Sequence, residues 1–299
     1  REQNRLKHEG KVFDVAWSPD GKQIVSASFD RTIKFWDVNG KEIKGTSAAT
    51  NNGLRLINFS PDVKTFAFER DENTFKILNL QEKQPEILVK HDSFGEVVWS
   101  PDGKTIASVS EDKIKLWDTQ GKLLKTLTND DGYDVSFSPD GKKIASVGEG
   151  GKIKLWNVNN GRVIKTITVG KNISVHNVIF SPDGKAIALK GNKELILWNI
   201  EKEETITLGK HDNRESIPNV VWSPDGNTIA SRADNTVKIW DKKGNLTQTL
   251  KGHNNFISSV QFSPDGKKIA TGSHDKTVRI WNLSEKKLTK LEAGIENHI

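Results

Sequence analysis

Residues 263–282 read SPDGKKIATGSHDKTVRIWN, and the rest of the chain consists of six further copies of this stretch, several of them altered. Each copy opens with the turn Ser-Pro-Asp, at Ser18, Ser60, Ser100, Ser138, Ser181, Ser223 and Ser263, so the intervals are 42, 40, 38, 43, 42 and 40 residues. The residue that closes each copy has the same period: Trp36, Leu78, Trp117, Trp156, Trp198, Trp240 and Trp281. Two independent markers with one period indicate a repeat protein.

Each copy has the pattern of four short β-strands. In the first copy, strands are expected at 12–17, 23–28 and 32–36, with a tight turn at 29–31; a fourth strand, such as 123–127 in the third copy, follows a polar turn. These runs are rich in Val, Ile, Phe and Trp and are bounded by Pro, Asp and Gly, as is typical of hairpins. In Pro-Asp-Gly the glycine accepts the positive φ that the turn requires.

Seven such copies are expected to close into a ring. An isolated four-stranded sheet cannot bury both faces, so each copy needs a neighbour on either side. The pattern predicts an all-β fold, a seven-bladed β-propeller, as one domain over residues 1–284 with a C-terminal extension at 285–299. Ile33 and Phe35 are expected to face one neighbouring blade and Trp36 the other.

Composition excludes several classes of protein. The chain of 299 residues is 34% apolar, in runs far shorter than the roughly 20 residues of a membrane helix. Its start lacks a signal-peptide core, so we expect a cytoplasmic location and no membrane partner. The chain has no methionine, so we expect it to be part of a longer polypeptide. Without cysteine, disulfides and thiol chemistry are excluded.

The net charge of +6 would suit a nucleic-acid partner if it were gathered on one face. Lysines instead recur after the turns and before the closing tryptophans, which spreads them around the ring. We interpret them as solvated residues that keep a monomeric domain soluble.

The segments DRTIKFWD (30–37), DNTVKIWD (234–241) and DKTVRIWN (275–282), together with Gly-His at 252–253, resemble WD repeats. The resemblance extends to about residue 284. It implies a hydrogen-bonded group of His, Ser or Thr, Asp and Trp in four copies: His8, Ser26, Asp30 and Trp36; His91, Ser108, Asp112 and Trp117; His211, Ser231, Asp234 and Trp240; His253, Thr271, Asp275 and Trp281. In such a group the hydroxyl accepts the indole N–H and the carboxylate accepts from histidine.

Copies two, four and five depart from this pattern, and we expect them to form the less rigid side of the ring. The altered positions are Val63, Phe68 and Leu78 in copy two, Gly150 in copy four, and Leu189 and Asn192 in copy five.

Two segments compete to complete the last blade. They are residues 3–7 and 287–291, the latter with Leu288 and Leu291 at the spacing seen after other tryptophans. The resemblance favours the N-terminal segment, because such rings close by pairing the first and last repeats.

The sequence nominates no catalytic residue, no cofactor and no metal site. Four histidines have structural roles, and His176, His274 and His298 have no carboxylate at ligand spacing. No nucleophile elbow or phosphate loop is present. We therefore expect a protein that is not an enzyme.

Function is expected on the face that carries the loop before each inner strand. The variable positions there include Lys11, Phe13, Phe29, Phe256, Ser258 and His274, in blades that are neighbours in a closed ring. Aromatic side chains beside cationic ones are typical of binding anchors. The alternative is that Phe13 and Phe256 plug the channel or pack under loops. The opposite arc is acidic around Tyr133, with Arg55, Asp71, Glu111, Asp130, Asp131 and Glu149.

These features favour a scaffold that binds a protein or peptide. One alternative is the ligand-sensing domain of a larger nucleotide-binding signalling protein, since the regular SPDGK turns look similar to those of bacterial, particularly cyanobacterial, WD-repeat regions. A nucleic-acid-binding propeller is a second alternative, and a propeller enzyme with a site assembled from several blades is a third.

Overall fold

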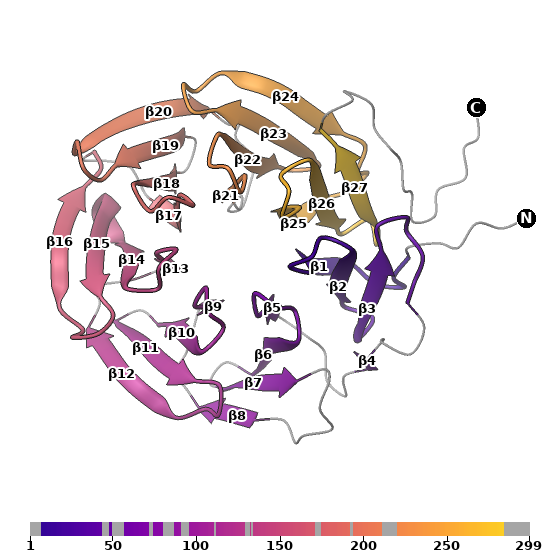
Figure 1. Cartoon of the computed structure of the whole chain (residues 1–299), viewed down its shortest axis with the longest axis horizontal. Helices are drawn as coiled ribbons and strands as arrows, with labels where there is room; N and C mark the ends of the chain where they lie inside the picture. The colour runs from indigo at the N-terminus through magenta and orange to yellow at the C-terminus, as the bar shows by residue number, and fades with distance from the viewer. Residues whose placement is uncertain are drawn as a thin grey trace, which may run out of the picture.

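The computed structural model describes residues 7–43, 48–49, 57–71, 74–79, 87–90, 96–110, 112–128, 132, 134–170, 175–191, 194–210 and 220–283. In this part of the chain the strands form seven antiparallel sheets, arranged as blades in a ring (Figure 1). Six sheets have four described strands, and the seventh has three. The predicted seven-bladed β-propeller is confirmed.

The strands follow one another in blade order. Blades one to four contain β1 (Val12–Trp17), β2 (Gln23–Ser28), β3 (Thr32–Asp37), β4 (Ala48–Ala49); β5 (Ile57–Phe59), β6 (Thr65–Asp71), β7 (Thr74–Asn79), β8 (Ile87–Lys90); β9 (Glu96–Trp99), β10 (Thr105–Val109), β11 (Lys113–Asp118), β12 (Leu123–Thr128); β13 (Asp134–Phe137), β14 (Lys143–Gly148), the 3-10 turn η1 (Glu149–Gly151), β15 (Lys152–Asn157) and β16 (Val163–Thr168). Blades five to seven contain β17 (Val175–Phe180), β18 (Ala186–Gly191), β19 (Glu194–Asn199), β20 (Glu204–Lys210); β21 (Val220–Trp222), β22 (Thr228–Ala233), β23 (Thr236–Asp241), β24 (Leu246–Lys251); β25 (Ile257–Phe262), β26 (Lys268–Ser273) and β27 (Val278–Asn282).

The Ser-Pro-Asp turns hold each inner strand to the next strand of its blade. In the first blade, Ser18 Oγ donates to Asp20 Oδ1 at 2.6 Å, and the Gln23 amide donates to Ser18 Oγ at 3.0 Å. The same Ser–Asp bond, also 2.6 Å long, recurs in every blade. The turn glycine has φ near +70°, as at Gly21. Val63 takes that place in blade two with φ 54°, a conformation that a β-branched residue rarely adopts.

The hydrophobic core is divided among the seven junctions between consecutive blades. Each junction holds one cluster of buried side chains. Ile33 belongs to the cluster shared with blade two, and Phe35 packs against it, whereas Trp36 belongs to the cluster shared with blade seven. The predicted division of these side chains between two neighbours is correct, because successive side chains of a strand point to opposite faces.

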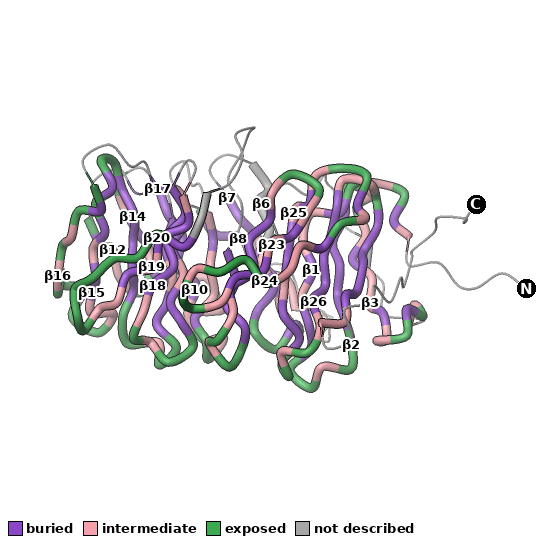
Figure 2. The backbone as a smooth tube through the Cα atoms, turned by 90° about the horizontal axis from the view of Figure 1, so that it is seen from above, coloured by how far each residue is buried: buried purple, intermediate pink, exposed green. Residues whose placement is uncertain are grey.

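The ring is closed by contacts between the first and last blades. Val12, Val15 and Trp36 pack with Ala270 and Ile280 in one cluster. In Figure 2 the buried segments run through the middle of the strands, and the exposed ones lie at the turns of both faces. Each face is therefore built from turns, and the two faces carry different ones.

The structure brings the beginning of the chain to the last blade. Lys7 forms an antiparallel bridge with Thr277, and the His8 amide donates to Lys276 O at 3.3 Å. This supports closure by the N-terminal segment. Residues 1–6 and 284–299, on which both competing closures and the C-terminal extension depend, lie outside the described residues.

Candidate partner-binding face

Blade one contains a hydrogen-bonded group that joins the loop before β1 to β2, to β3 and to the turn between them. Trp36 Nε1 donates to Ser26 Oγ at 2.8 Å, and His8 Nε2 lies 2.7 Å from the same oxygen. His8 Nδ1 lies 2.9 Å from Asp30 Oδ2, which also accepts from the Glu9 amide at 3.0 Å. Every donor in this buried chain has an acceptor, so the group anchors the loop against the blade.

Blade seven repeats the arrangement with threonine in place of serine. Trp281 Nε1 donates to Thr271 Oγ1 at 2.9 Å, and His253 Nε2 lies 2.6 Å from that oxygen. His253 Nδ1 lies 2.7 Å from Asp275 Oδ2. The two complete groups therefore stand in adjacent blades.

Burial determines the protonation of these groups. Burial lowers the pKa of His8 and of His253 below the ordinary 6.5, although the neighbouring aspartates act in the opposite direction. Burial raises the pKa of Asp30, but hydrogen bonds from Thr32 and interaction with His8 outweigh it and hold the pKa below its ordinary value. Each histidine is thus neutral at pH 7, with Nδ1–H donating to a carboxylate and Nε2 accepting from a hydroxyl.

In blades three and six, the described residues of the predicted group are the tryptophan, the serine and the aspartate. Trp117 Nε1 donates to Ser108 Oγ at 2.8 Å, and Trp240 Nε1 donates to Ser231 Oγ at 2.9 Å. Asp112, however, has a side chain that is 69% exposed and lies 3.6 Å from Lys113 Nζ. Asp234 is exposed as well. His91 and His211 lie outside the described residues.

The length of the hairpin explains this difference. Serine and tryptophan are 10 residues apart in blade one and 9 apart in blades three and six. The shorter hairpin of blade six is a two-residue turn, in which Ala233 pairs with Thr236 and Asp234 has φ 52°. Its aspartate stands at the tip of the turn, so the structure does not place Asp112 and Asp234 as it places Asp30 and Asp275.

The altered blades lack different members of the group. In blade four, Trp156 Nε1 still donates to Ser146 Oγ at 2.9 Å, a pair that the sequence motif did not predict, and Gly150 has φ 69° in the turn. In blade five, Leu189 is fully buried where the hydroxyl would be. The Phe68 side chain and Asn192 lie outside the described set.

We expect amide hydrogens of β7, β15 and β19 to exchange with solvent about tenfold faster than those of β3 and β27, because the complete groups are missing from their blades. Hydrogen exchange followed by mass spectrometry of peptides measures this. Equal protection of the five strands would contradict a rigidifying role for the complete groups.

On the face where these two groups lie, the inner strand of blade one carries an aromatic side chain, Phe13, which is partly buried and packs against the cluster between blades one and two. Val12 pairs with Ser28 and Asp14 with Ala27, so Phe13 occupies a β-bulge. Bulges re-aim side chains. The Phe13 ring lies 3.7 Å from the Phe29 ring between centroids, and Phe29 remains 49% exposed at the hairpin tip.

A second aromatic pair lies in the adjacent blade. The ring centroids of Phe256 and His274 are 5.1 Å apart, and the Arg232 guanidinium of blade six lies 4.8 Å from the Phe256 centroid. Arg232 Nη1 donates to Ile257 O, which holds the cation in place beneath the ring. The sequence analysis did not predict a role for Arg232. An arginine inside a strand, at the position where other blades have Ala27 or Val147, could have indicated one.

Electrostatics connect the two pairs. Burial lowers the pKa of His274, and the charges of Lys11 and Arg232 lower it further. Lys11 is exposed, and Phe256 and His274 are partly exposed. These residues form one set that spans blades six, seven and one, here called the aromatic-cation cluster. Its members are Lys11, Phe13, Phe29, Phe256, His274 and Arg232.

The acidic arc opposite this cluster is described in part. Glu149 is exposed in η1. The side chains of Tyr133, Arg55, Asp71, Glu111, Asp130 and Asp131 lie outside the described residues.

A second set of polar residues joins the inner strands and was not noticed in the sequence. Ser259 Oγ of blade seven donates to Asp14 Oδ1 of blade one at 2.8 Å. Asn177 Nδ2 of blade five donates to Asp134 Oδ2 of blade four at 2.7 Å. Each residue stands four positions before a turn serine, as does Glu96 of blade three. This inner polar belt links consecutive blades through side chains.

The carboxyl groups of the belt are strongly perturbed. Burial raises the pKa of Asp14 to about 7. The hydrogen bonds from Ser259 and Val15 and the charge of Arg232 lower the pKa, but they offset only part of the effect of burial. Burial and the neighbouring Asp134 raise the pKa of Glu96 well above its ordinary value. Glu96 therefore keeps its proton to higher pH than an exposed glutamate does, and it interacts with Asp134 as the hydrogen-bond donor of the buried pair.

No group of three or more His, Asp or Glu side chains is placed to hold a metal ion in the described part of the chain. Among the same residues, no helix is long and apolar enough to cross a membrane.

Two family models match the chain. The model of the WD domain, G-beta repeat, matches residues 2–37, 202–241 and 244–282. The model of eukaryotic translation initiation factor eIF2A matches residues 65–189. The second and third WD matches each contain the outer strand of one blade, β20 or β24, and the three strands of the next blade.

Three relatives illustrate the range of similar proteins. The transcriptional corepressor LEUNIG_HOMOLOG of Arabidopsis thaliana is 28% identical over 167 residues, which cover 41% of this chain and 21% of that protein. The small ribosomal subunit protein RACK1y of Oryza sativa is 28% identical over 123 residues, 39% of this chain and 36% of that protein. An uncharacterized WD repeat-containing protein of Synechocystis is 29% identical over 138 residues, 45% of this chain and 40% of that protein. The chain spans less than half the length of each relative.

The seven repeated blades and the hydrogen-bonded groups within them define a repeat β-propeller. More specifically, the chain is a WD-repeat propeller, similar to a cyanobacterial protein of that kind.

Proposed function

We propose that this propeller is a non-enzymatic scaffold, a monomeric domain that binds a protein or peptide partner through the aromatic-cation cluster. The observation that carries the proposal is Phe29, which stays 49% exposed at a hairpin tip although its ring contacts that of Phe13. An exposed aromatic side chain on a rigid support has little conformational entropy to lose on binding.

The charges of the cluster favour a partner with acidic groups. Lys11 and Arg232 are cationic. His274 becomes cationic when a carboxylate of the partner lies beside it and raises its pKa. A segment that presents apolar side chains beside Asp or Glu would bury against the phenylalanines and pair with Lys11, which is exposed, while the buried Arg232 attracts it only through its charge. The names of the relatives, a corepressor and a ribosomal subunit protein, are in keeping with an interaction role.

The complete hydrogen-bonded groups support the same assignment. His8 and His253 hold the loops before β1 and β25 against their blades. The cluster therefore sits beside two anchored loops, which reduces the entropy lost when a partner binds.

The test is affinity capture with the whole chain as bait, comparing wild type with Phe29→Asp. Leu124→Asp is the matched control, because Leu124 is 51% exposed but lies on the outer strand β12, away from the cluster. We expect a partner that wild type and Leu124→Asp retain and that Phe29→Asp binds at least about tenfold more weakly.

Recovery of the same proteins by all three baits would contradict the proposed face. Capture that disappears after nuclease treatment and falls steeply with salt would indicate a nucleic-acid-binding propeller instead. A small molecule retained in place of a protein would favour a ligand-sensing domain.

A further inference from the structure

A cavity opens between blades seven, one and two, at the end of the inner strands opposite to the aromatic-cation cluster. Its volume is about 290 Å³, room for about ten water molecules. One proline from each of three Ser-Pro-Asp turns, Pro19, Pro61 and Pro264, contributes to its wall.

The identity of one small residue explains why the space lies at these blades. Ala16, Asn58 and Gln261 stand two positions before their turn serines and line the cavity. The corresponding residues of blades three, five and six are Val98, Ile179 and Val221. The short Ala16 side chain leaves room between Asn58 and Gln261, which project amide groups rather than branched apolar ones.

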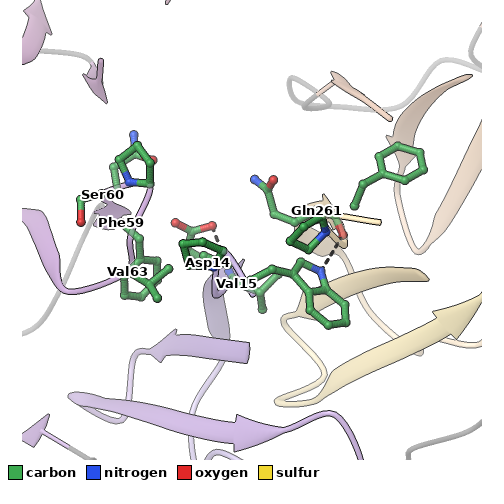
Figure 3. Close-up of a pocket in the computed structure, with 13 residues that line it drawn as sticks. Asp14, Val15, Phe59, Ser60, Val63 and Gln261 are labelled. Atoms are coloured by element: carbon green, nitrogen blue, oxygen red, sulfur yellow. Dashed lines mark hydrogen bonds between the residues drawn. The ribbon is translucent and has the colours of Figure 1, made fainter. Parts of the chain in front are cut away.

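Asp14 is the ionisable residue of the cavity lining. Its Oδ1 accepts from the Val15 amide at 2.9 Å and from Ser259 Oγ at 2.8 Å. Among the described residues, Oδ2 has no hydrogen-bond partner. In Figure 3 the carboxylate lies between Phe59 and Val63 on one side and Gln261 on the other.

Two further acceptors accompany this oxygen. Asn58 donates through Nδ2 to Val97 O, which leaves its carbonyl oxygen available. The side-chain amide of Gln261 has no partner among the residues that the structure describes, and its backbone oxygen accepts from Trp17 Nε1 at 3.1 Å. An ammonium group has three donors and no acceptor, so it matches an anionic oxygen and two amide carbonyls.

We propose that this cavity binds an alkylammonium group, either of a free amine or of a lysine side chain, with the charge on Asp14 and the alkyl chain against Phe59, Val63 and the turn prolines. The apolar walls favour the methylene chain. A bound cation also offsets the desolvation free energy of the ionised Asp14 carboxylate, one oxygen of which has no hydrogen-bond partner among the described residues. The cavity lining contains no residue of the aromatic-cation cluster, although the charge of Arg232 acts on Asp14.

The test is a titration of the whole chain with n-butylammonium, with Nα-acetyl-lysine methylamide, and with neutral 1-pentanol, followed by NMR or calorimetry. We expect both cations to bind in the millimolar range and pentanol at least about tenfold more weakly. Stronger binding of the lysine derivative would indicate a protein side chain as the source, and stronger binding of butylammonium would indicate a free amine.

Variants locate the site. Asp14→Asn keeps an acceptor for Val15 and Ser259, and we expect it to weaken cation binding about tenfold or more. Ala16→Val narrows the cavity and is expected to weaken binding without changing any charge. Glu9→Gln, which removes one negative charge on the other face, is expected to bind as wild type does.

The pH profile provides a further readout. The groups that face Asp14 are Ser259 on β25 and Arg232 on β22, and the pKa of Asp14 is raised to about 7. Affinity is therefore expected to fall as pH is lowered through 7. The absence of cation binding to the folded wild type, equal affinities for butylammonium and pentanol, or undiminished binding by both Asp14→Asn and Ala16→Val would overturn the proposal.

Discussion

Asp275→Ala is expected to lower the free energy of unfolding by about 1–3 kcal/mol, whereas Asp112→Ala changes it by less than about 0.5 kcal/mol. The Asp275 side chain is 7% exposed and accepts from His253 Nδ1 at 2.7 Å, from Thr277 Oγ1 at 2.6 Å and from the Thr277 amide at 2.9 Å. Removing the carboxylate leaves these donors without an acceptor. Asp112, in contrast, faces solvent beside Lys113.

Urea denaturation of wild type and both variants measures this difference. The comparison is informative because the two aspartates follow their Ser or Thr at the same distance in sequence. Equal destabilisation by both substitutions would show that the hairpin length does not matter. No destabilisation by Asp275→Ala would remove the hydrogen-bonded group as a source of stability.

Asp14→Asn is expected to raise the free energy of unfolding at pH 8 by an amount on the order of 2 kcal/mol and to leave it nearly unchanged at pH 4. Burial raises the pKa of Asp14 in the folded protein from 3.8 to about 7. Below pH 3.8 the group is protonated in both states. As pH rises from 3.8 to 7, only the unfolded chain ionises freely, so wild type loses stability that the variant keeps.

Thermal or urea unfolding of both proteins from pH 4 to pH 8 checks this expectation. If the whole rise in the pKa of Asp14 acts on stability, it corresponds to about 4 kcal/mol in the free energy of unfolding. The expected increase in the free energy of unfolding of Asp14→Asn is smaller than this, because the neutral amide of the variant no longer compensates the charge of Arg232. Asp112→Asn is the control, because the Asp112 side chain is 69% exposed. A difference between wild type and Asp14→Asn that is the same at pH 4 and pH 8 would contradict the buried-carboxylate assignment.

The aspartates of blades one and seven are placed differently from those of blades three and six, for a reason that was present in the sequence. Counting from serine to tryptophan distinguishes the longer hairpins of blades one and seven from the shorter ones of blades three and six. The assignment of Asp234 to the motif considered only the residue type and did not take into account that the hairpin of blade six is one residue shorter. In a two-residue turn the aspartate adopts a positive φ at the tip and points to solvent.

The aromatic-cation cluster was predicted in part for a similar reason. The positions of Phe13, Phe29, Phe256 and His274 on one face follow from the order of strands and turns. Their pairing depends on details that a strand pattern does not contain. The bulge at Phe13 turns that ring toward Phe29, and Arg232 comes from a third blade.

The sequence by itself determined the number of blades, the strands and the turns. These features rest on local interactions, such as the Ser18–Asp20 hydrogen bond across two residues and the alternation of Ile33 and Trp36 along one strand. The tertiary structure alone decided which polar groups meet in the interior. Ser259 and Asp14 are 245 residues apart, and only closure of the ring places them 2.8 Å from each other. The protonation of Asp14, the cavity beside it and the stacking of Arg232 on Phe256 all depend on such distant contacts, because burial and charge act through space rather than along the chain.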